Sequence, residues 1–218
     1  MIVVIQCAAR KRPNAGMMRT SKGIPALFVA DPDNAPLSGT HIFARPDDQF
    51  DDKVSWRELL KQYNAAPGNN TLGLFPAFEL YENDLYRQFV NQYGTGNIYI
   101  LSAGWGLINA GFLTPYYDIT FSQSADQFKR RKKTDCYHDF CMLPDRSDDQ
   151  IIFFGGKDYL PLFCALTRAH SGKKTIFYNS QNLPDASGYL LKRFVTNTRT
   201  NWHYECAKAF LDGKLDVA

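Results

Sequence analysis

Four short apolar runs constrain the fold of this chain more than any other feature, namely residues 2–5, 98–101, 151–154 and 175–178. Each is rich in β-branched or aromatic residues and continuously apolar, which is typical of a strand buried on both faces of a parallel sheet. Helical patterns separate several of these runs. The sequence therefore predicts a single α/β domain over residues 1–218, with a mostly parallel central sheet covered by helices.

The segments between the strands carry weaker signals. Apolar stripes predict helices over 51–65 and 76–93, with Gly94 as the C-cap of the second. Further helices are expected from about residue 122, from the turn at 155–159 through 169, and within a C-terminal helical segment over 185–218. Residues 13–50 are rich in Pro, Gly, Asn and Asp, which predicts an irregular N-terminal excursion with a small hairpin.

Composition excludes some classes of protein. No run approaches the roughly 18 apolar residues of a membrane helix, and the N-terminus lacks a signal-peptide pattern, so we expect no membrane association. Five scattered cysteines favour a reducing, cytoplasmic location. Neither GxGxxG nor GxxxxGK[ST] is present, and no cofactor is predicted. The net charge of +3 is too small to indicate a nucleic-acid partner by itself, and the oligomeric state stays open.

Candidate binding residues follow three of the predicted strands. In open α/β sheets, ligands bind beyond the carboxyl ends of the strands. If the sheet is parallel, one pocket for a base and a phosphate is expected from the residues after these strands: Cys7, Arg10 and Lys11; Ser102, Gly104 and Trp105; Gly155, Gly156, Lys157 and Tyr159. Cys7 can also be interpreted as a small buried residue. Gly155 and Gly156 can also be interpreted as a tight turn.

Tyr116, Tyr117 and Asp118 follow a proline after the second of these strands. They place two aromatic rings and a carboxylate near the same strand end. Asp118 is the candidate catalytic residue, because a carboxylate can orient a water molecule or stabilise a cationic sugar. A helix N-cap or turn carboxylate is the equally weighted alternative.

A basic run follows, consisting of Lys129, Arg130, Arg131, Lys132 and Lys133. Aromatic neighbours and a second basic cluster at residues 10–12 and Arg19 favour contact with a nucleic-acid backbone over a merely solvated face. Cys136, His138 and Cys141 come next, and His203 or Cys206 would have to complete a zinc site. Because no second CxxC-type pair is present, no metal is predicted.

Several segments, taken in order, resemble the YaaA-type superfamily, which includes the peroxide-stress protein YaaA and small bacterial and phage relatives. The resemblance is carried by the segments CAARK at 7–11, LYENDLY at 80–86, LSAGWGL at 101–107, PYYD at 115–118 and FGGKDY at 154–159. It implies a nucleic-acid-related role, such as DNA binding in stress protection or phage defence. The chain departs from the pattern at Trp105, at the doubled Tyr116 and Tyr117, and in the long excursion.

Together these observations predict a nucleic-acid-binding protein, with DNA as the partner, that acts as a DNA glycosylase-like hydrolase on a base or its N-glycosidic bond. Trp105 and either Tyr116 or Tyr117 would stack a flipped base, while Arg10, Lys11 and Lys157 would hold phosphates. Two alternatives stay open. One is a non-catalytic DNA-binding stress or phage-defence protein, and the other is a hydrolase of free nucleotides.

Overall fold

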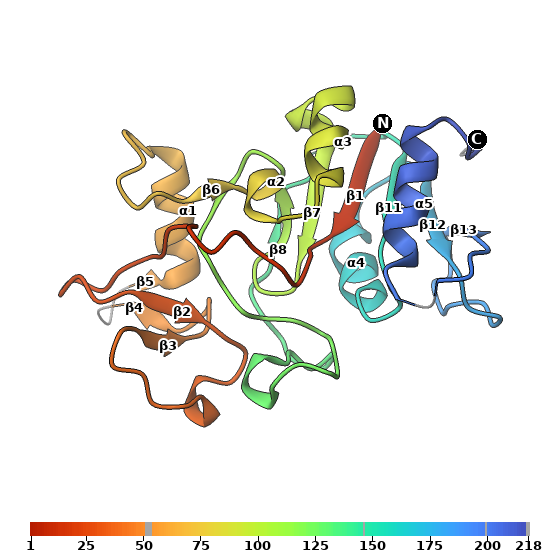
Figure 1. Cartoon of the computed structure of the whole chain (residues 1–218). Helices are drawn as coiled ribbons and strands as arrows, with labels where there is room; N and C mark the ends of the chain where they lie inside the picture. Colours follow the sequence, from red (N-terminus) through yellow and green to blue (C-terminus); the bar gives the residue numbers. More distant parts are fainter. Residues whose placement is uncertain (51–53, 146, 199, 217–218) are drawn as a thin grey trace.

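The computed structural model describes residues 1–50, 54–145, 147–198 and 200–216. Within these ranges, seven strands form a mixed, mostly parallel sheet in the order β10-β8-β7-β1-β11-β12-β13 (Figure 1). The four predicted runs are confirmed as its adjacent parallel centre, which consists of β7 (Ile98–Ser102), β1 (Ile2–Gln6), β11 (Ile151–Phe154) and β12 (Lys174–Tyr178). The α/β prediction therefore holds at the level of architecture.

Three strands at the margins of the sheet were not predicted. β8 (Gly106–Asn109) folds back antiparallel on β7, and β10 (Phe140–Cys141) pairs with it. Gly106 makes this reversal possible, because its φ of +88° is a conformation that other residues rarely adopt. β13 (Leu190–Arg193) pairs with β12, so the prediction of a helical segment over 185–218 is wrong in its first part. Only α5 (Trp202–Leu211) is helical there.

Helices cover both faces of the sheet, as two neighbouring phenylalanines of β11 show. The Phe154 ring lies 6.0 Å from Phe89 of α3 (Leu85–Tyr93) and 5.4 Å from Phe210 of α5. The Phe153 ring stacks at 4.2 Å on Phe163 of α4 (Leu160–Thr167). Because successive strand residues point to opposite faces, α3 and α5 cover one face and α4 covers the other.

Two predicted helices have different bounds. The helix expected over 76–93 is interrupted. Its first part, α2 (Ala77–Leu80), is followed by Tyr81, which is extended and pairs with Lys11 in an isolated bridge. α3 follows, and the Gly94 cap is confirmed by its positive φ and its N–H bond to the Val90 carbonyl. The first helix, α1 (Trp56–Ala65), begins after Ser55, whose side chain accepts from the Glu58 N–H; residues 51–53 of that prediction lie outside the described residues.

The helix expected from residue 122 is wrong. This segment holds only the 3₁₀ turn η3 (Gln127–Lys129), because its backbone groups make isolated i→i+3 turn bonds and bonds to other segments in place of an i→i+4 helical ladder. The Arg131 N–H donates to the Thr120 carbonyl, the Thr120 N–H donates to the Lys129 carbonyl, and the Phe128 carbonyl accepts from Asp31.

The N-terminal excursion is more ordered than predicted. It contains the 3₁₀ turn η1 (Pro32–Asn34) and a parallel pair of strands, β2 (Ala26–Phe28) and β3 (Ile42–Ala44). At its end, β4 (Gln49–Phe50) pairs antiparallel with β5 (Val54–Ser55). The buried Phe28 ring attaches it to the domain through edge contacts with Trp56 and Trp105. The remaining short elements are η2 (Thr95–Asn97) and the pair β6 (Phe75–Pro76) with β9 (Leu113–Thr114). Among the helices of the described ranges, none is long and apolar enough to span a bilayer.

The turn at Gly106 gives a test of this fold. A Cβ atom there would lie 2.5 Å from the Phe140 carbonyl oxygen, whereas at Gly188, which also has a positive φ, it would meet nothing within 4 Å. We expect Gly106→Ala to lower the free energy of unfolding by about 2–4 kcal/mol, from backbone strain plus overpacking, and Gly188→Ala by only about 1 kcal/mol. Urea unfolding of both variants measures the difference, and equal losses would contradict the described path of β8.

Candidate functional site

The structure brings together the three strand ends that carry the predicted site. β7, β1 and β11 are adjacent and parallel, so the segments that begin at Ser102, Cys7 and Gly155 leave the same edge of the sheet. Buried hydroxyl groups fill the space behind this edge. The Ser102 Oγ donates to the Tyr117 hydroxyl at 2.8 Å, the Tyr117 and Tyr81 hydroxyls are 2.8 Å apart, and the Cys7 Sγ lies 3.2 Å from the Tyr159 hydroxyl.

These tyrosines are neutral. Burial raises the pKa of Tyr81, Tyr117 and Tyr159 well above the ordinary tyrosine value, because the phenolate is disfavoured away from water. Further along, the Tyr86 hydroxyl donates to the Gln6 carbonyl and lies 3.1 Å from the Tyr204 hydroxyl of α5. The cluster therefore offers uncharged hydroxyl dipoles to whatever charge lies beside it.

Lys11 is the charged residue that enters this cluster. Only 8% of it is exposed, its Nζ donates to the Ala9 carbonyl at 3.3 Å, and it lies 4.2 Å from the centre of the Tyr117 ring. In the part of the chain that the structure describes, no ion pair joins Lys11 to a carboxylate. Burial lowers the pKa of Lys11 below its ordinary value, although nearby Cys7 and Asp118 oppose the effect.

Asp118 lies at the outer side of the same group. Its carboxylate is 3.0 Å from the Lys129 Nζ, and the two side chains are 32% and 27% exposed. Lys129 also pairs with Asp126 at 2.8 Å, and these two acids raise the pKa of Lys129 through hydrogen bonds and charge. The Asp118 N–H donates to the Phe28 carbonyl, and no helix begins at this residue, so the N-cap interpretation does not apply.

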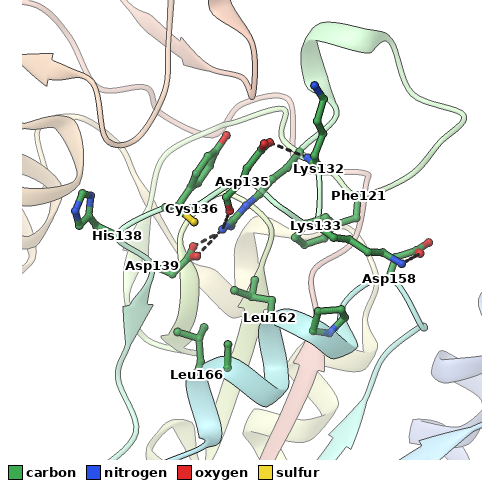
Figure 2. Close-up of a pocket in the computed structure, with 14 residues that line it drawn as sticks. Phe121, Lys132, Lys133, Asp135, Cys136, His138, Asp139, Asp158, Leu162 and Leu166 are labelled. Carbon is green, nitrogen blue, oxygen red and sulfur yellow. Dashed lines mark hydrogen bonds and ion pairs between the residues drawn. The ribbon is translucent and has the colours of Figure 1, made fainter. Parts of the chain in front are cut away.

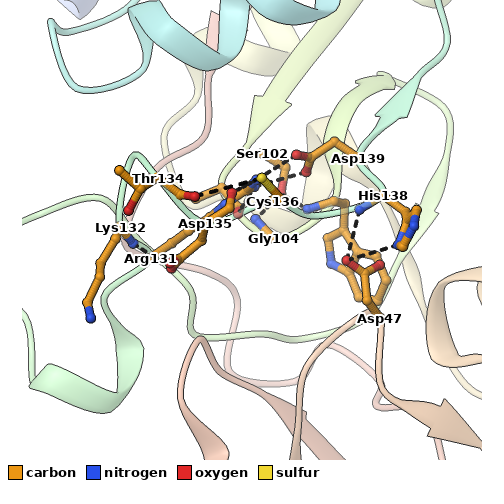
Figure 3. A network of polar contacts seen from close by, with 12 residues as sticks. Asp47, Ser102, Gly104, Arg131, Lys132, Thr134, Asp135, Cys136, His138 and Asp139 are labelled. Carbon is orange, nitrogen blue, oxygen red and sulfur yellow. Dashed lines mark hydrogen bonds and ion pairs between the residues drawn. The ribbon is translucent and has the colours of Figure 1, made fainter.

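The turn after β7 is held by two buried arginines (Figure 3). The Arg57 guanidinium donates to the Gly104 and Trp105 carbonyls, both at 3.0 Å, and Arg131 donates to the Ala103 carbonyl at 2.9 Å. Each arginine has its own acid: the Asp47 carboxylate lies 2.5 Å from the Arg57 Nε, and Asp139 accepts two bonds from Arg131 at 2.9 and 2.6 Å. The Ser102 Oγ accepts the Gly104 and Trp105 N–H groups.

Two of the residues predicted to stack on a base have no exposed surface for that contact. Trp105 and Tyr117 are fully buried; the Trp105 ring packs edge-on against Phe28, and the Tyr117 ring fills the space that a Cβ on Gly104 would enter. The prediction that they stack a flipped base is wrong, because the close approach permitted by the glycines serves the protein's own core. Tyr116 is half-buried and is the one predicted stacking residue with exposed surface.

The paired glycines of the β11–α4 turn also serve packing. A Cβ on Gly155 would lie 2.2 Å from the Phe153 ring, and the Gly156 N–H donates to the Gln6 side chain at 2.6 Å. Neither observation points to a phosphate. Arg10 and Lys157 are exposed at this edge, as predicted for phosphate contacts.

The basic run does not form one cationic surface. Arg131 is buried in its pair with Asp139, Lys129 pairs with Asp118, and Lys133 pairs with Asp158 at 2.8 Å. Lys132 is exposed, and the half-buried Arg130 contacts the Gln123 side chain. The run consequently offers fewer unpaired cations than the sequence suggests, and the predicted contact with nucleic acid stays a prediction.

A cavity of about 360 Å³ lies between α4 and residues 131–139 (Figure 2). Leu162 and Leu166 form an apolar wall, and the Lys133–Asp158 pair stands at one side, while Lys132 points its ammonium away. Phe121 separates it from the hydroxyl cluster, since its ring meets that of Tyr159 edge-on at 5.0 Å. A second, more open cavity of about 670 Å³ lies along α1 and β10.

The cysteine and histidine residues near this cavity are not arranged for a metal. The Cys136 Sγ donates to the Thr134 carbonyl, the Cys141 Sγ to the Leu166 carbonyl, and His138 is exposed. His203 and Cys206 are buried in α5. Over the described ranges, no three His, Cys, Asp or Glu side chains group closely enough to hold an ion.

Comparison of the chain with protein-family models, curated proteins and solved structures gives no match. The resemblance to the YaaA-type superfamily therefore stays a prediction that rests on the short segments themselves.

The sequence analysis did not identify several residues that build the site. Arg57 falls in the expected helix over 51–65 and its partner Asp47 in the irregular excursion, while Tyr81 and Tyr86 fall in the expected helix over 76–93. A weak signal existed for the tyrosines, because LYENDLY is one of the segments that carry the resemblance. Arg57 gave no sequence signal, because nothing in the sequence indicates its pair with Asp47, ten residues away. Arg131 appeared only as a member of the basic run, without its partner Asp139.

The contribution of the buried Arg131 to the stability of the turn after β7 can be tested by unfolding experiments. Arg131→Met would leave Asp139 buried without its cation, and we expect a loss of about 3–5 kcal/mol in the free energy of unfolding. The double variant Arg131→Met/Asp139→Asn removes both charges and should lose less. The control Arg87→Met breaks a pair with the exposed Asp84, for which we expect a change within about 1 kcal/mol. An Arg131→Met loss no larger than that of Arg87→Met would contradict the proposed support.

Proposed function

We propose that the protein binds DNA and hydrolyses an N-glycosidic bond at the edge formed by β7, β1 and β11. One observation carries the proposal: Asp118, a partly exposed carboxylate at this edge, shares its charge environment with Lys11 and Lys129. A carboxylate so placed can orient a water molecule or stabilise the cationic sugar that forms as the base leaves. Lys129, which its two acids keep cationic, complements a phosphate beside that sugar.

The other roles follow from exposure. Tyr116 is the aromatic residue available to contact the base, and Arg10 and Lys157 are available for the backbone. Trp105 and Tyr117 have no direct role, since they lie in the core. The resemblance to the YaaA-type superfamily supports a nucleic-acid-related role independently of this geometry. A DNA-binding stress or defence protein without catalysis is the outcome if no base is released.

Asp118 and Asp126 form a matched pair for testing catalysis. Both carboxylates contact the same Lys129, but Asp126 is 63% exposed and lies on the turn η3. We expect Asp118→Asn to reduce base release by at least a hundredfold while leaving DNA retention within about threefold, because a general base contributes roughly 10²–10⁴ in rate. Asp126→Asn should retain activity. Mass spectrometry of bases released from a panel of unmodified and modified DNAs measures both, and full activity of Asp118→Asn would remove this residue from the mechanism.

A hydrolase of free nucleotides is the second candidate. The cavity between α4 and residues 131–139 favours it, because about 360 Å³ lies in the range of small-ligand sites and its wall is apolar. Such an enzyme would act on a mononucleotide with little competition from DNA.

Salt dependence separates the two candidates. For a polymer partner, the logarithm of the association constant should fall linearly with the logarithm of salt concentration, by about 0.9 for each phosphate neutralised. We expect Arg10→Met to reduce this slope by about one, whereas Lys133→Met, whose ammonium already pairs with Asp158, should change it less. Fluorescence anisotropy with labelled duplex and single strands supplies the data, and binding indifferent to salt would favour the free-nucleotide candidate.

A further inference from the structure

Lys11 is a buried lysine that forms no ion pair with any of the residues that the structure describes. Its amine touches a backbone carbonyl and the face of the Tyr117 ring, and the hydroxyls around it are neutral tyrosines. Burying an ammonium without a counter-charge costs several kcal/mol, and proteins commonly respond by neutralising the group. The lowered pKa of Lys11, caused mainly by burial, agrees with this expectation. A neutral lysine amine is a nucleophile.

The nearby Lys129 has the opposite character. It touches two carboxylates, Asp118 and Asp126, which raise its pKa, so it stays a cation. The groups that act electrostatically on Lys11 are Cys7, Asp118 and Lys129. This edge of the sheet thus holds an amine, a carboxylate and a fixed cation, and the last two are partly exposed. Sites that shift the pKa values of like groups in opposite directions are commonly catalytic.

We propose that the Lys11 amine forms a Schiff base with the aldehyde carbon of a ring-opened deoxyribose, so that the protein is also a lyase at abasic sites in DNA. The inference rests on the proposed function, because removal of a base creates this sugar. It goes further by assigning a nucleophile and a second reaction that hydrolysis does not require.

The reaction needs no oxidant or reductant. The nitrogen lone pair attacks C1′ and the carbonyl π bond breaks. The oxygen takes one proton from the amine and one from solvent and leaves as water, which gives a protonated imine. A proton from C2′ then passes to a base, for which the Asp118 carboxylate is placed, and the bond between C3′ and the 3′-phosphate oxygen breaks. Water hydrolyses the conjugated imine, which releases the unsaturated aldehyde and restores the amine.

Trapping with sodium cyanoborohydride tests this directly. The reagent reduces a protonated imine to a stable secondary amine, so the full-length protein incubated with an oligonucleotide that carries one abasic site should gain the mass of that oligonucleotide. Peptide mapping should place the adduct on Lys11. Lys11→Met, which fills similar space against the Tyr117 ring, should lose at least 95% of the adduct. Lys208→Arg, on the exposed side of α5, should lose none.

The outcomes separate this inference from the proposed function. An adduct on Lys11 together with base release supports both, and an adduct without base release supports the lyase alone. Base release with no adduct, or with the adduct on another lysine, would overturn the role of Lys11 and leave glycosidic hydrolysis standing. Mapping of the unaltered protein decides the matter even if Lys11→Met fails to fold.

Discussion

The three consecutive carbonyl groups at the end of β7 set the arrangement of the whole site. They belong to Ala103, Gly104 and Trp105, they point into the protein, and a buried carbonyl without a donor is costly. Here the donors are two guanidinium groups, and each buried guanidinium in turn requires an acid. The turn can therefore form only when distant segments of the chain supply both.

Apart from Arg57, which lies in α1, these groups come from parts of the chain with little regular structure. Asp47 comes from the N-terminal excursion and also accepts the N–H of His138, so it ties the excursion to the loop that carries Asp139. The excursion and residues 131–139 thus dock against the same turn from two sides (Figure 3). Beyond the short β2–β3 and β4–β5 ladders, these long segments are ordered by buried charge pairs and by the aromatic contacts of Phe28.

This arrangement explains which features of the site could be predicted from sequence. The central strands were predictable, because a run such as Ile2–Gln6 is apolar throughout and a strand buried on both faces must be so. β13 was not, because its Leu-Leu-Lys-Arg pattern belongs to a half-exposed edge and is compatible with a helix. The roles of Trp105 and Tyr117 were misjudged for a different reason. Residue type indicates that a ring can stack, but only the paths of Arg57 and Phe28 decide that the ring is inside.

Under the proposed function, Lys11 and Asp118, and not the glycine turn, would supply the reacting groups. The polar atoms of the turn are already bonded within the protein, and the tyrosine hydroxyls bond mainly to one another. Asp118 has its lysine partner at the surface, whereas Lys11 has an aromatic face and no carboxylate in contact among the described residues. A fold that needed only stability would gain from an apolar residue at position 11, since an ammonium against a ring in the interior forfeits its hydration. The loss of stability that comes from burying the Lys11 amine is understandable if that amine takes part in the reaction.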